Sequence, residues 1–282
     1  MNIRVLYCIV GMLIACSAQA QPGSTLKRIT DSKSIVLGYR TEAAPFSFAA
    51  PDGQPAGYSV DLCKRVVASL EQQLKVPGLA IKWVPVTAAN RIAQVTGGFV
   101  DLECGTTTVT LGRLEQVDFS SLIFVDGGSF VTAGIGPRSL AELAGKRVGV
   151  LAGSTTEPRL RSVLKERKID AQVVVLRDDR EVVGALTAKK IDAFANDRLA
   201  LIGRVLLGSK GGEFTLADED FSLEPYALMM RRDAPFRLAV NRALAQIYSG
   251  RQIIEVYDRW FSDLGRPGPL LASMYYLNAL GE

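Results

Sequence analysis

The sequence predicts an α/β protein of two lobes, each a mostly parallel sheet flanked by helices, with two crossover strands joining them. Three observations support this fold class. Strand-like segments alternate with amphipathic helical segments over residues 35–104, and the alternation restarts over 147–196. The stretch between the two runs, 120–137, is rich in Gly and β-forming residues and has no helical stripe. A last strand and two helices follow the second run, and their return to the first lobe would supply the second crossover.

The first run has a β-α-β-α-β order. Its longer helix is marked by apolar residues at three- and four-residue spacing, namely Val60, Cys63, Val67, Leu70 and Leu74. Around this helix we expect strands at 35–39, 81–86 and 99–104 and a short helix at 90–96. Because consecutive parallel strands need helical crossovers, this order favours a parallel sheet.

The second run repeats the pattern after residue 137. We expect strands at 147–151, 172–176 and 191–196, with helices after Gly153 and at 181–188, then a strand at 226–231 and helices at 240–248 and 252–260. The domain boundaries that follow are 1–20 for a removable leader, 21–128 for the first part of lobe 1, 129–223 for lobe 2, and 224–282 for the return to lobe 1.

The first twenty residues have the layout of an export signal. Arg4 precedes an apolar run from Val5 to Ala15, and Ala18-Gln19-Ala20 places small residues at the cleavage positions. We therefore expect a periplasmic protein secreted through a signal peptide, rather than a short buried helix at the start of the fold. Leu13-Ile14-Ala15-Cys16 also resembles a bacterial lipobox, so a lipoprotein anchored at Cys16 is the alternative.

Composition excludes several classes of function. The chain contains no histidine, which removes the usual general base and the commonest metal ligand. No Cys pair has zinc spacing, so we expect neither a metal site nor a cofactor. The net charge is only +4 and acidic and basic residues alternate, which disfavours nucleic-acid binding. We expect a monomer and a binding protein rather than an enzyme.

Several polar groups follow predicted strands, where open α/β sheets place their ligands. Gly105-Thr106-Thr107-Thr108 comes directly after a strand, and Arg113 lies five residues further on. Backbone N–H groups and hydroxyls of such a loop can hold a carboxylate that Arg clamps with two hydrogen bonds. The alternative is an ordinary Thr-rich turn beside a surface Arg.

The other candidates lie at further strand ends. Ser154 and Thr155 stand at a helix N-terminus, which attracts anions, although Ser or Thr there can equally serve as a plain N-cap. Asp197 follows the strand at 191–196 and can pair with an ammonium group or cap the next helix. Arg40 ends the first strand and Arg91 begins the short helix, and each alone is typical of a solvated surface charge. Together these groups suit a zwitterion with an extra negative charge.

The order of these segments resembles family 3 of the bacterial extracellular solute-binding proteins, and within it the periplasmic glutamate/aspartate-binding branch. The resemblance spans about Ser24 to Phe261, and the segments that carry it are Gly38-Tyr39-Arg40-Thr41-Glu42, Pro45-Phe46-Ser47, Gly57-Tyr58-Ser59-Val60-Asp61, Asn90-Arg91, 101–108, Asp118-Phe119-Ser120, Leu143-Ala144-Gly145-Lys146 and 153–157. It implies a type II periplasmic-binding-protein fold, a free amino acid ligand and an inner-membrane ABC permease as partner.

The resemblance also implies residue roles. Arg113 and the Thr106/Thr108 loop would grip the α-carboxylate, and Asp197 would take the α-amino group. Thr155 would close from the other lobe, while Arg40 and Arg91 would face a side-chain carboxylate. Two specificity positions depart from the branch: Ala88 stands where the branch has Ser, and Asp179 where it has a His near the ligand.

The cysteines leave two possibilities open. Cys63 and Cys104 remain after the leader is removed, and the branch often has a second Cys where this chain has Leu228. Cys63 and Cys104 would then either form a disulfide or stay as two buried thiols. Because both are expected on core-facing positions, and buried Cys commonly behaves as a small hydrophobe, we favour two thiols.

Two other functions share this fold class. Some relatives are cyclohexadienyl dehydratases, which act on arogenate or prephenate and need a carboxyl acid–base group in the cleft. A sensory ligand-binding domain is the third hypothesis for the function. Both are expectations from analogy of fold, and the transport receptor is the preferred one.

Overall fold

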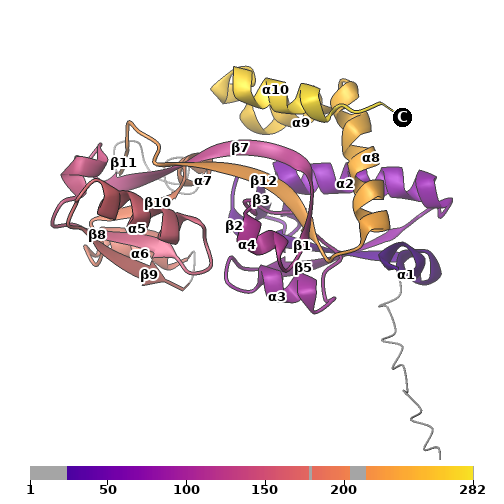
Figure 1. The fold of residues 1–282 in the computed structure, drawn as a ribbon, viewed down its shortest axis with the longest axis horizontal. Helices are drawn as coiled ribbons and strands as arrows, with labels where there is room; N and C mark the ends of the chain where they lie inside the picture. Colours follow the sequence, from indigo (N-terminus) through magenta and orange to yellow (C-terminus); the bar gives the residue numbers. More distant parts are fainter. Residues whose placement is uncertain (1–23, 178–179, 204–213, 282) are drawn as a thin grey trace, which may run out of the picture.

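The computed structural model describes residues 24–177, 180–203 and 214–281. Figure 1 shows two lobes connected by two long strands, β7 (Asp118–Ala133) and β12 (Ser222–Met230). The main sheet of the described chain runs in the order β5-β1-β6-β12-β7-β10-β8-β9, with β11 (Phe214–Leu216) paired to β7. The two-lobed α/β fold class is therefore confirmed. The predicted leader with Cys16, and the specificity position Asp179, lie outside the described residues.

The first lobe contains the three parallel strands β1 (Ser34–Arg40), β5 (Ala80–Val86) and β6 (Leu102–Glu103). The amphipathic helix α2 (Tyr58–Leu74) buries Cys63, Val67 and Leu70 against this sheet, as its spacing predicts. Helices α1 (Thr25–Ser32) and α3 (Arg91–Thr96) complete the lobe, with a small second sheet of β2 (Glu42–Ala43), β3 (Ser47–Ala49) and β4 (Pro55–Ala56).

One strand of this lobe is shorter than predicted. The expected strand at 99–104 contains only Leu102–Glu103, because the side chain of Asp101 takes over part of the pairing. Its Oδ2 accepts a hydrogen bond from the backbone N–H of Val36 at 2.7 Å and another from Arg28. A side-chain acceptor at this position satisfies a donor that a longer ladder would otherwise use.

The second lobe repeats the architecture. Its parallel strands are β8 (Arg147–Leu151), β9 (Gln172–Leu176) and β10 (Ala193–Asp197). Helices α5 (Thr156–Glu166), α6 (Glu181–Thr187) and α7 (Arg198–Leu201) surround them, and the chain enters the lobe through the 3-10 turn at Leu140–Leu143. The predicted strands and helices of this unit are confirmed to within a few residues, which is the usual uncertainty at element ends.

The predicted crossover at 120–137 is an extended strand. β7 is 16 residues long and pairs antiparallel with β12 in the part near the first lobe and with β10 and β11 in the second lobe. Gly128 lets the crossovers approach, since a Cβ atom there would lie 2.2 Å from Ser222 Oγ. The C-terminal part of β12 pairs with β6, so the chain does return to the first lobe.

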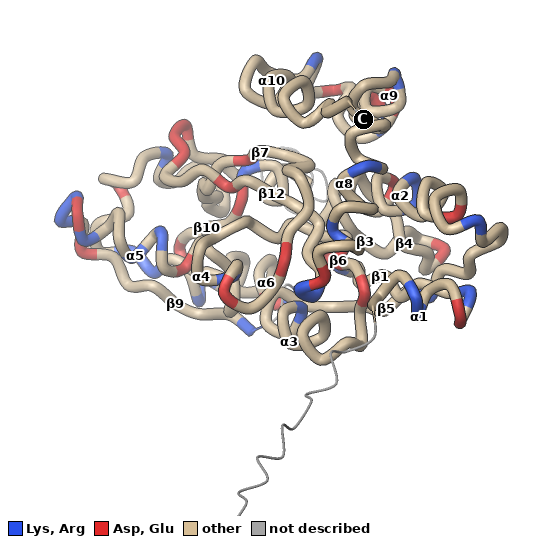
Figure 2. Tube along the Cα trace, turned by 45° about the vertical axis from the view of Figure 1, so that its right-hand side comes forward, with Lys and Arg blue, Asp and Glu red and all other residues tan. Residues whose placement is uncertain are grey.

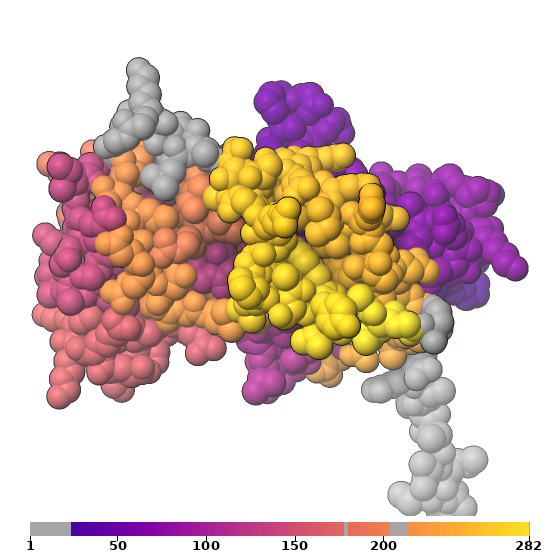
Figure 3. All heavy atoms as spheres, turned by 90° about the horizontal axis from the view of Figure 1, so that it is seen from above, coloured from indigo at the N-terminus to yellow at the C-terminus, as the bar shows by residue number. Residues whose placement is uncertain are grey.

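The C-terminal helices cover the first lobe and the crossover. Helices α8 (Ala234–Ser249) and α9 (Gln252–Phe261) match the predicted positions, whereas α10 (Pro269–Asn278) was not predicted. Figure 3 shows these helices, in orange to yellow, over the middle of the molecule. Tyr275 of α10 reaches Tyr58, 2.8 Å away, and Tyr58 donates to the carbonyl oxygen of Ile123 on β7 at 2.7 Å.

Charged residues of both signs are interspersed along the described parts of both lobes (Figure 2). Among the described helices, none is both long and apolar enough to cross a bilayer.

Candidate functional site

A pocket lies between the lobes, at the carboxyl ends of parallel strands from both lobes. The first lobe contributes six of its lining residues, Arg40, Ala43, Ala88, Arg91, Thr106 and Thr108, and the second contributes Leu151, Ser154, Thr155, Thr156, Asn196, Asp197 and Ala200. This is the place where open α/β sheets bind small molecules.

Most of the predicted site residues meet here. Arg40, Ala88, Arg91, Thr106, Thr108, Ser154, Thr155 and Asp197 all line the pocket. Arg113 is the one described member of the predicted set that does not. The convergence arises because β1, β6, β8 and β10 each end at the pocket, so residues far apart in sequence meet there.

The pocket contains a strongly basic region. Arg40 and Arg91 are buried, with exposed fractions of 4% and 3%. Arg91 Nε has no hydrogen-bond partner in the described chain. Burial and the nearby charge of Arg113 lower the pKa of Arg91 to about 9. A guanidinium that is buried in this way is stabilised by an anion, which makes this region a candidate site for a carboxylate.

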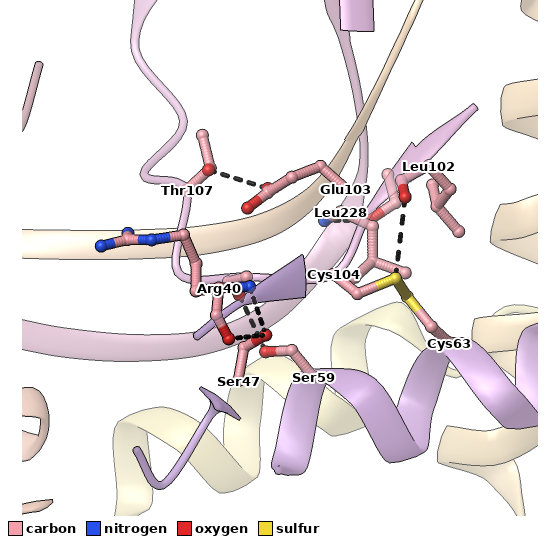
Figure 4. The surroundings of a disulfide bond; sticks show 11 residues. Arg40, Ser47, Ser59, Cys63, Leu102, Glu103, Cys104, Thr107 and Leu228 are labelled. Carbon is pink, nitrogen blue, oxygen red and sulfur yellow. Dashed lines mark hydrogen bonds between the residues drawn. A yellow bond between two sulfur atoms is a disulfide. The ribbon is translucent and has the colours of Figure 1, made fainter. Parts of the chain in front are cut away.

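A disulfide at Cys104 anchors the chain just before the Thr106–Thr108 loop. Cys63 of α2 is bonded to Cys104, with their Cα atoms 6.2 Å apart (Figure 4). Ser59, one turn earlier on the same helix, donates to the carbonyl oxygen of Gly105 at 2.8 Å. Our preference for two free thiols was therefore wrong: the core-facing position of Cys63 places it directly against Cys104, which is within the range a disulfide spans.

Arg113 lies behind the loop. It belongs to the short helix α4 (Leu111–Leu114), which Thr110 caps by accepting from the Arg113 N–H. Its Nη1 donates to the carbonyl oxygen of Thr108 at 2.8 Å, and its Nη2 donates to that of Gly153 in the second lobe at 3.2 Å. Arg113 thus supports the threonine loop and connects the lobes, and burial lowers its pKa while nearby acids oppose that shift.

The second lobe presents hydroxyls at the start of α5. Thr155 occupies the N-cap position, yet its side chain makes no capping hydrogen bond in the described structure. Instead its hydroxyl donates to Glu224 Oε2 at 2.7 Å, and Ser154 donates to the carbonyl oxygen of Leu151. The simple capping alternative for Thr155 is therefore not supported.

Asp197 is the acidic group of the pocket. Tyr226 donates to its Oδ2, while its Oδ1 is buried without a partner among the described residues. It also makes no capping bond to α7 in that part of the chain. Burial and the neighbouring charge of Glu224 raise the pKa of Asp197 to about 7. A ligand cation at Oδ1 would favour the ionised form.

Sequence reasoning missed three buried acids around the pocket. Glu103 is fully buried, with Oε2 accepting from Thr107 and Oε1 unpartnered in the described chain (Figure 4). Glu224 and Asp126 occupy paired positions of β12 and β7, and burial raises the pKa of Asp126 well above its usual range. A carboxylate inside an otherwise apolar strand was the available signal, because such a group is seldom fully buried without a role.

Residues 35–263 match the sequence model of the bacterial extracellular solute-binding proteins, family 3. A protein of Pseudomonas aeruginosa named L-glutamate/L-aspartate-binding protein is 34% identical over 243 residues, which is 84% of this chain and 80% of that protein. The glutamate/aspartate import solute-binding protein of Escherichia coli is 31% identical over 255 residues, covering 90% and 84%.

Solved structures agree with the sequence matches. An ancestral arginine-binding protein, solved with bound glutamine, superposes with a TM-score of 0.72 at 25% identity. The match covers 81% of this chain and 98% of that one.

Proposed function

Because this chain belongs to family 3 of the bacterial extracellular solute-binding proteins, we propose that it binds a free amino acid in the pocket between its lobes and delivers it to an ABC permease of the inner membrane. In this proposal residues 1–20 are an export signal and the binding protein acts in the periplasm. Residues 21–128 and 224–282 form one lobe and residues 129–223 the other, and the two close over the ligand about β7 and β12.

One observation indicates which class of ligand the pocket binds. Two residues that line the pocket each have a buried polar atom without a partner in the described chain, the guanidinium nitrogen Arg91 Nε and the carboxylate oxygen Asp197 Oδ1. Unpaired buried polar groups are costly, so the pocket complements a molecule that offers both a carboxylate and an ammonium group. An α-amino acid is the simplest such molecule.

A ligand with an acidic side chain suits the positive charge that the pocket arginines provide. Arg40 and Arg91 both line the pocket, and the relatives described above are named for glutamate and aspartate. The buried acids Glu103 and Glu224 offset part of this positive charge. The preference for an acidic ligand therefore depends on Arg40 and Arg91 lying nearer to the ligand side chain than these acids do. The dehydratase alternative is not favoured, because those relatives are named as binding and import proteins.

Thermal-shift and competition measurements test this proposal on a chain that begins at Gln21. Ligand at about a hundred times its dissociation constant should add about 2.7 kcal/mol of stability. We expect glutamate or aspartate to displace every neutral or basic amino acid. A preference for glutamine or arginine would overturn the acidic assignment, and no response to any amino acid would overturn the function itself.

The Arg91→Gln variant sharpens the test. It removes a pocket cation and should weaken glutamate binding more than glutamine binding. Arg161→Gln, which alters an exposed i, i+4 pair with Glu157, is the matched control and should change neither. Mass spectrometry of the exported protein separates cleavage before Gln21 from acylation at Cys16.

A further inference from the structure

Glu224 accepts hydrogen bonds from the pocket hydroxyls of both lobes. It lies on the crossover strand β12 with an exposed fraction of 1%. Its Oε2 accepts from Thr108 of the first lobe and from Thr155 of the second, both at 2.7 Å. Its Oε1 accepts from Ser222 at 2.6 Å. Three hydroxyl donors thus satisfy this buried carboxylate.

These hydrogen bonds fix the direction in which the hydroxyls of Thr108 and Thr155 donate their protons. A hydroxyl has one proton, and a carboxylate has none to give back. The protons of Thr108 and Thr155 therefore point at Glu224, and the lone pairs of both oxygens are left for the pocket that these residues line. The two oxygens are 3.3 Å apart and so form a pair of neighbouring acceptors.

An ammonium group matches this arrangement, because it has three donors and no acceptor. Asp197 lines the same pocket, and its Oδ1, which has no partner in the described chain, is a third acceptor. A carboxylate ligand, by contrast, would need the hydroxyl protons that Glu224 already binds. The side chains of Thr108 and Thr155 thus suit the amine end of a ligand, and the guanidinium groups suit its carboxylates.

We propose that Glu224 is a positioning residue for amine recognition: by binding the hydroxyl protons of Thr108 and Thr155, it turns both threonine oxygens into acceptors for the ligand's ammonium group. The inference rests on the proposed function, since it takes the ligand to be an amino acid. It reassigns the two hydroxyls, which the family resemblance places on the α-carboxylate. It also requires the hydroxyls to come from different lobes, so that the amine is held only when the lobes meet.

Charge supports the same assignment. Asp197 is close enough for the charge of Glu224 to disfavour its ionised form, and a ligand cation would offset that repulsion. Arg113 of α4 is near enough for its positive charge to interact with Glu224. A ligand ammonium group would add positive charge beside Glu224 and Asp197.

Glu224→Gln tests the proposal, because the amide keeps the size of the side chain but can donate a proton to a threonine oxygen. The probes are L-glutamate and glutarate, which share a carbon chain and differ in the amine. We expect the variant to lose about 10- to 100-fold in glutamate affinity and to keep its glutarate affinity. Glu224→Asp, which keeps the charge, should restore part of the loss. Glu255→Gln, an exposed site on α9, is the control and should change neither affinity.

A second measurement needs no glutarate binding. If Glu224 acts through the hydroxyls, Thr155→Val combined with Glu224→Gln should lose no more glutamate affinity than the weaker-binding single variant. Additive losses, equal losses for both probes, or an unchanged glutamate affinity in Glu224→Gln would each overturn the proposal. Wild-type protein that binds no amino acid would overturn the amine site together with the proposed function, whereas the other failures leave that function intact.

Discussion

Gly153 of the second lobe lies against the backbone of Ala88 in the first. A Cβ atom on Gly153 would come within 2.7 Å of the Ala88 carbonyl oxygen, closer than side-chain carbons approach such atoms. Gly153 also has a φ of +75°, a conformation that glycine adopts at little cost. The residue follows β8 and begins the turn that carries Ser154 and Thr155, so this contact sets how near the two walls of the pocket can come.

We predict that Gly153→Ala weakens ligand binding by preventing full approach of the lobes. The strain of a positive φ would by itself cost roughly 1 kcal/mol of folding stability, which must be separated from the effect on closure. Gly145→Ala is the matched control, because Gly145 has a φ of +70° but open space around its Cβ position. Both variants should lose similar stability by denaturant unfolding, and calorimetry should show reduced affinity for Gly153→Ala alone.

Arg113→Ala should lower amino acid affinity by about 1.5–3 kcal/mol, the range for a hydrogen bond made by a charged group, while the protein stays folded. The guanidinium supports the Thr108 carbonyl and reaches Gly153 across the lobes, so its loss frees the threonine loop and removes an interlobe bond. Calorimetry against Arg161→Ala, an exposed control, measures the difference. Near-normal affinity in Arg113→Ala would show that the loop holds its position without this side chain.

Ligand affinity should depend on pH through Asp197. Because the pKa of Asp197 in the ligand-free protein is raised to about 7, the carboxyl is largely protonated at pH 6. Because this pKa is raised from an ordinary value of 3.8, the contribution of Asp197 to folding stability is complete only below about pH 3.8 and is lost as the pH rises from there through about 7. An ammonium ligand needs the ionised form, so affinity should fall by up to tenfold per pH unit below about 7.

Proton release on binding measures this linkage directly. Titration calorimetry in buffers of different ionisation enthalpy should detect a proton released near pH 6 and little release at pH 8.5. Asp197→Asn should bind every α-amino acid more weakly and lose the pH dependence. A variant that loses one amino acid and keeps another would contradict the assignment of Asp197 to the shared ammonium group.

The Cys63–Cys104 disulfide should stabilise the first lobe and the loop beside it. It closes a segment with a sequence separation of 41 residues, for which chain entropy suggests about 4 kcal/mol. A chain beginning at Gln21 and folded under oxidising conditions should show no free thiol after denaturation. Two free thiols in that titration would restore our first expectation. Replacing both cysteines by Ala should lower stability and weaken ligand binding, since Gly105 is adjacent to the bond.

Much of the fold followed from local patterns. The 3.6-residue stripe of α2 and the β-rich runs at β1, β5, β8 and β9 depend on side chains close in sequence, so periodicity identifies them. The helix α10 was not predicted because several of its apolar residues are exposed and leave no clean apolar stripe, namely Leu270, Tyr276 and Leu277. The strand β6 proved short because a side chain, that of Asp101, competes with the backbone, which periodicity does not register.

The sequence by itself determined which polar residues follow the strands. Because a chain with two α/β lobes brings the carboxyl ends of its strands together at the cleft, five of these residues meet there: Arg40, Arg91, Thr108, Thr155 and Asp197. Only the tertiary structure decided their partners. Whether Cys63 bonds, whether Arg113 lines the pocket or supports it, and which hydroxyl protons Glu224 accepts depend on distances of a few ångströms between residues as much as 116 positions apart. Those distances are set by strand register and by the approach of the lobes, which no local pattern encodes.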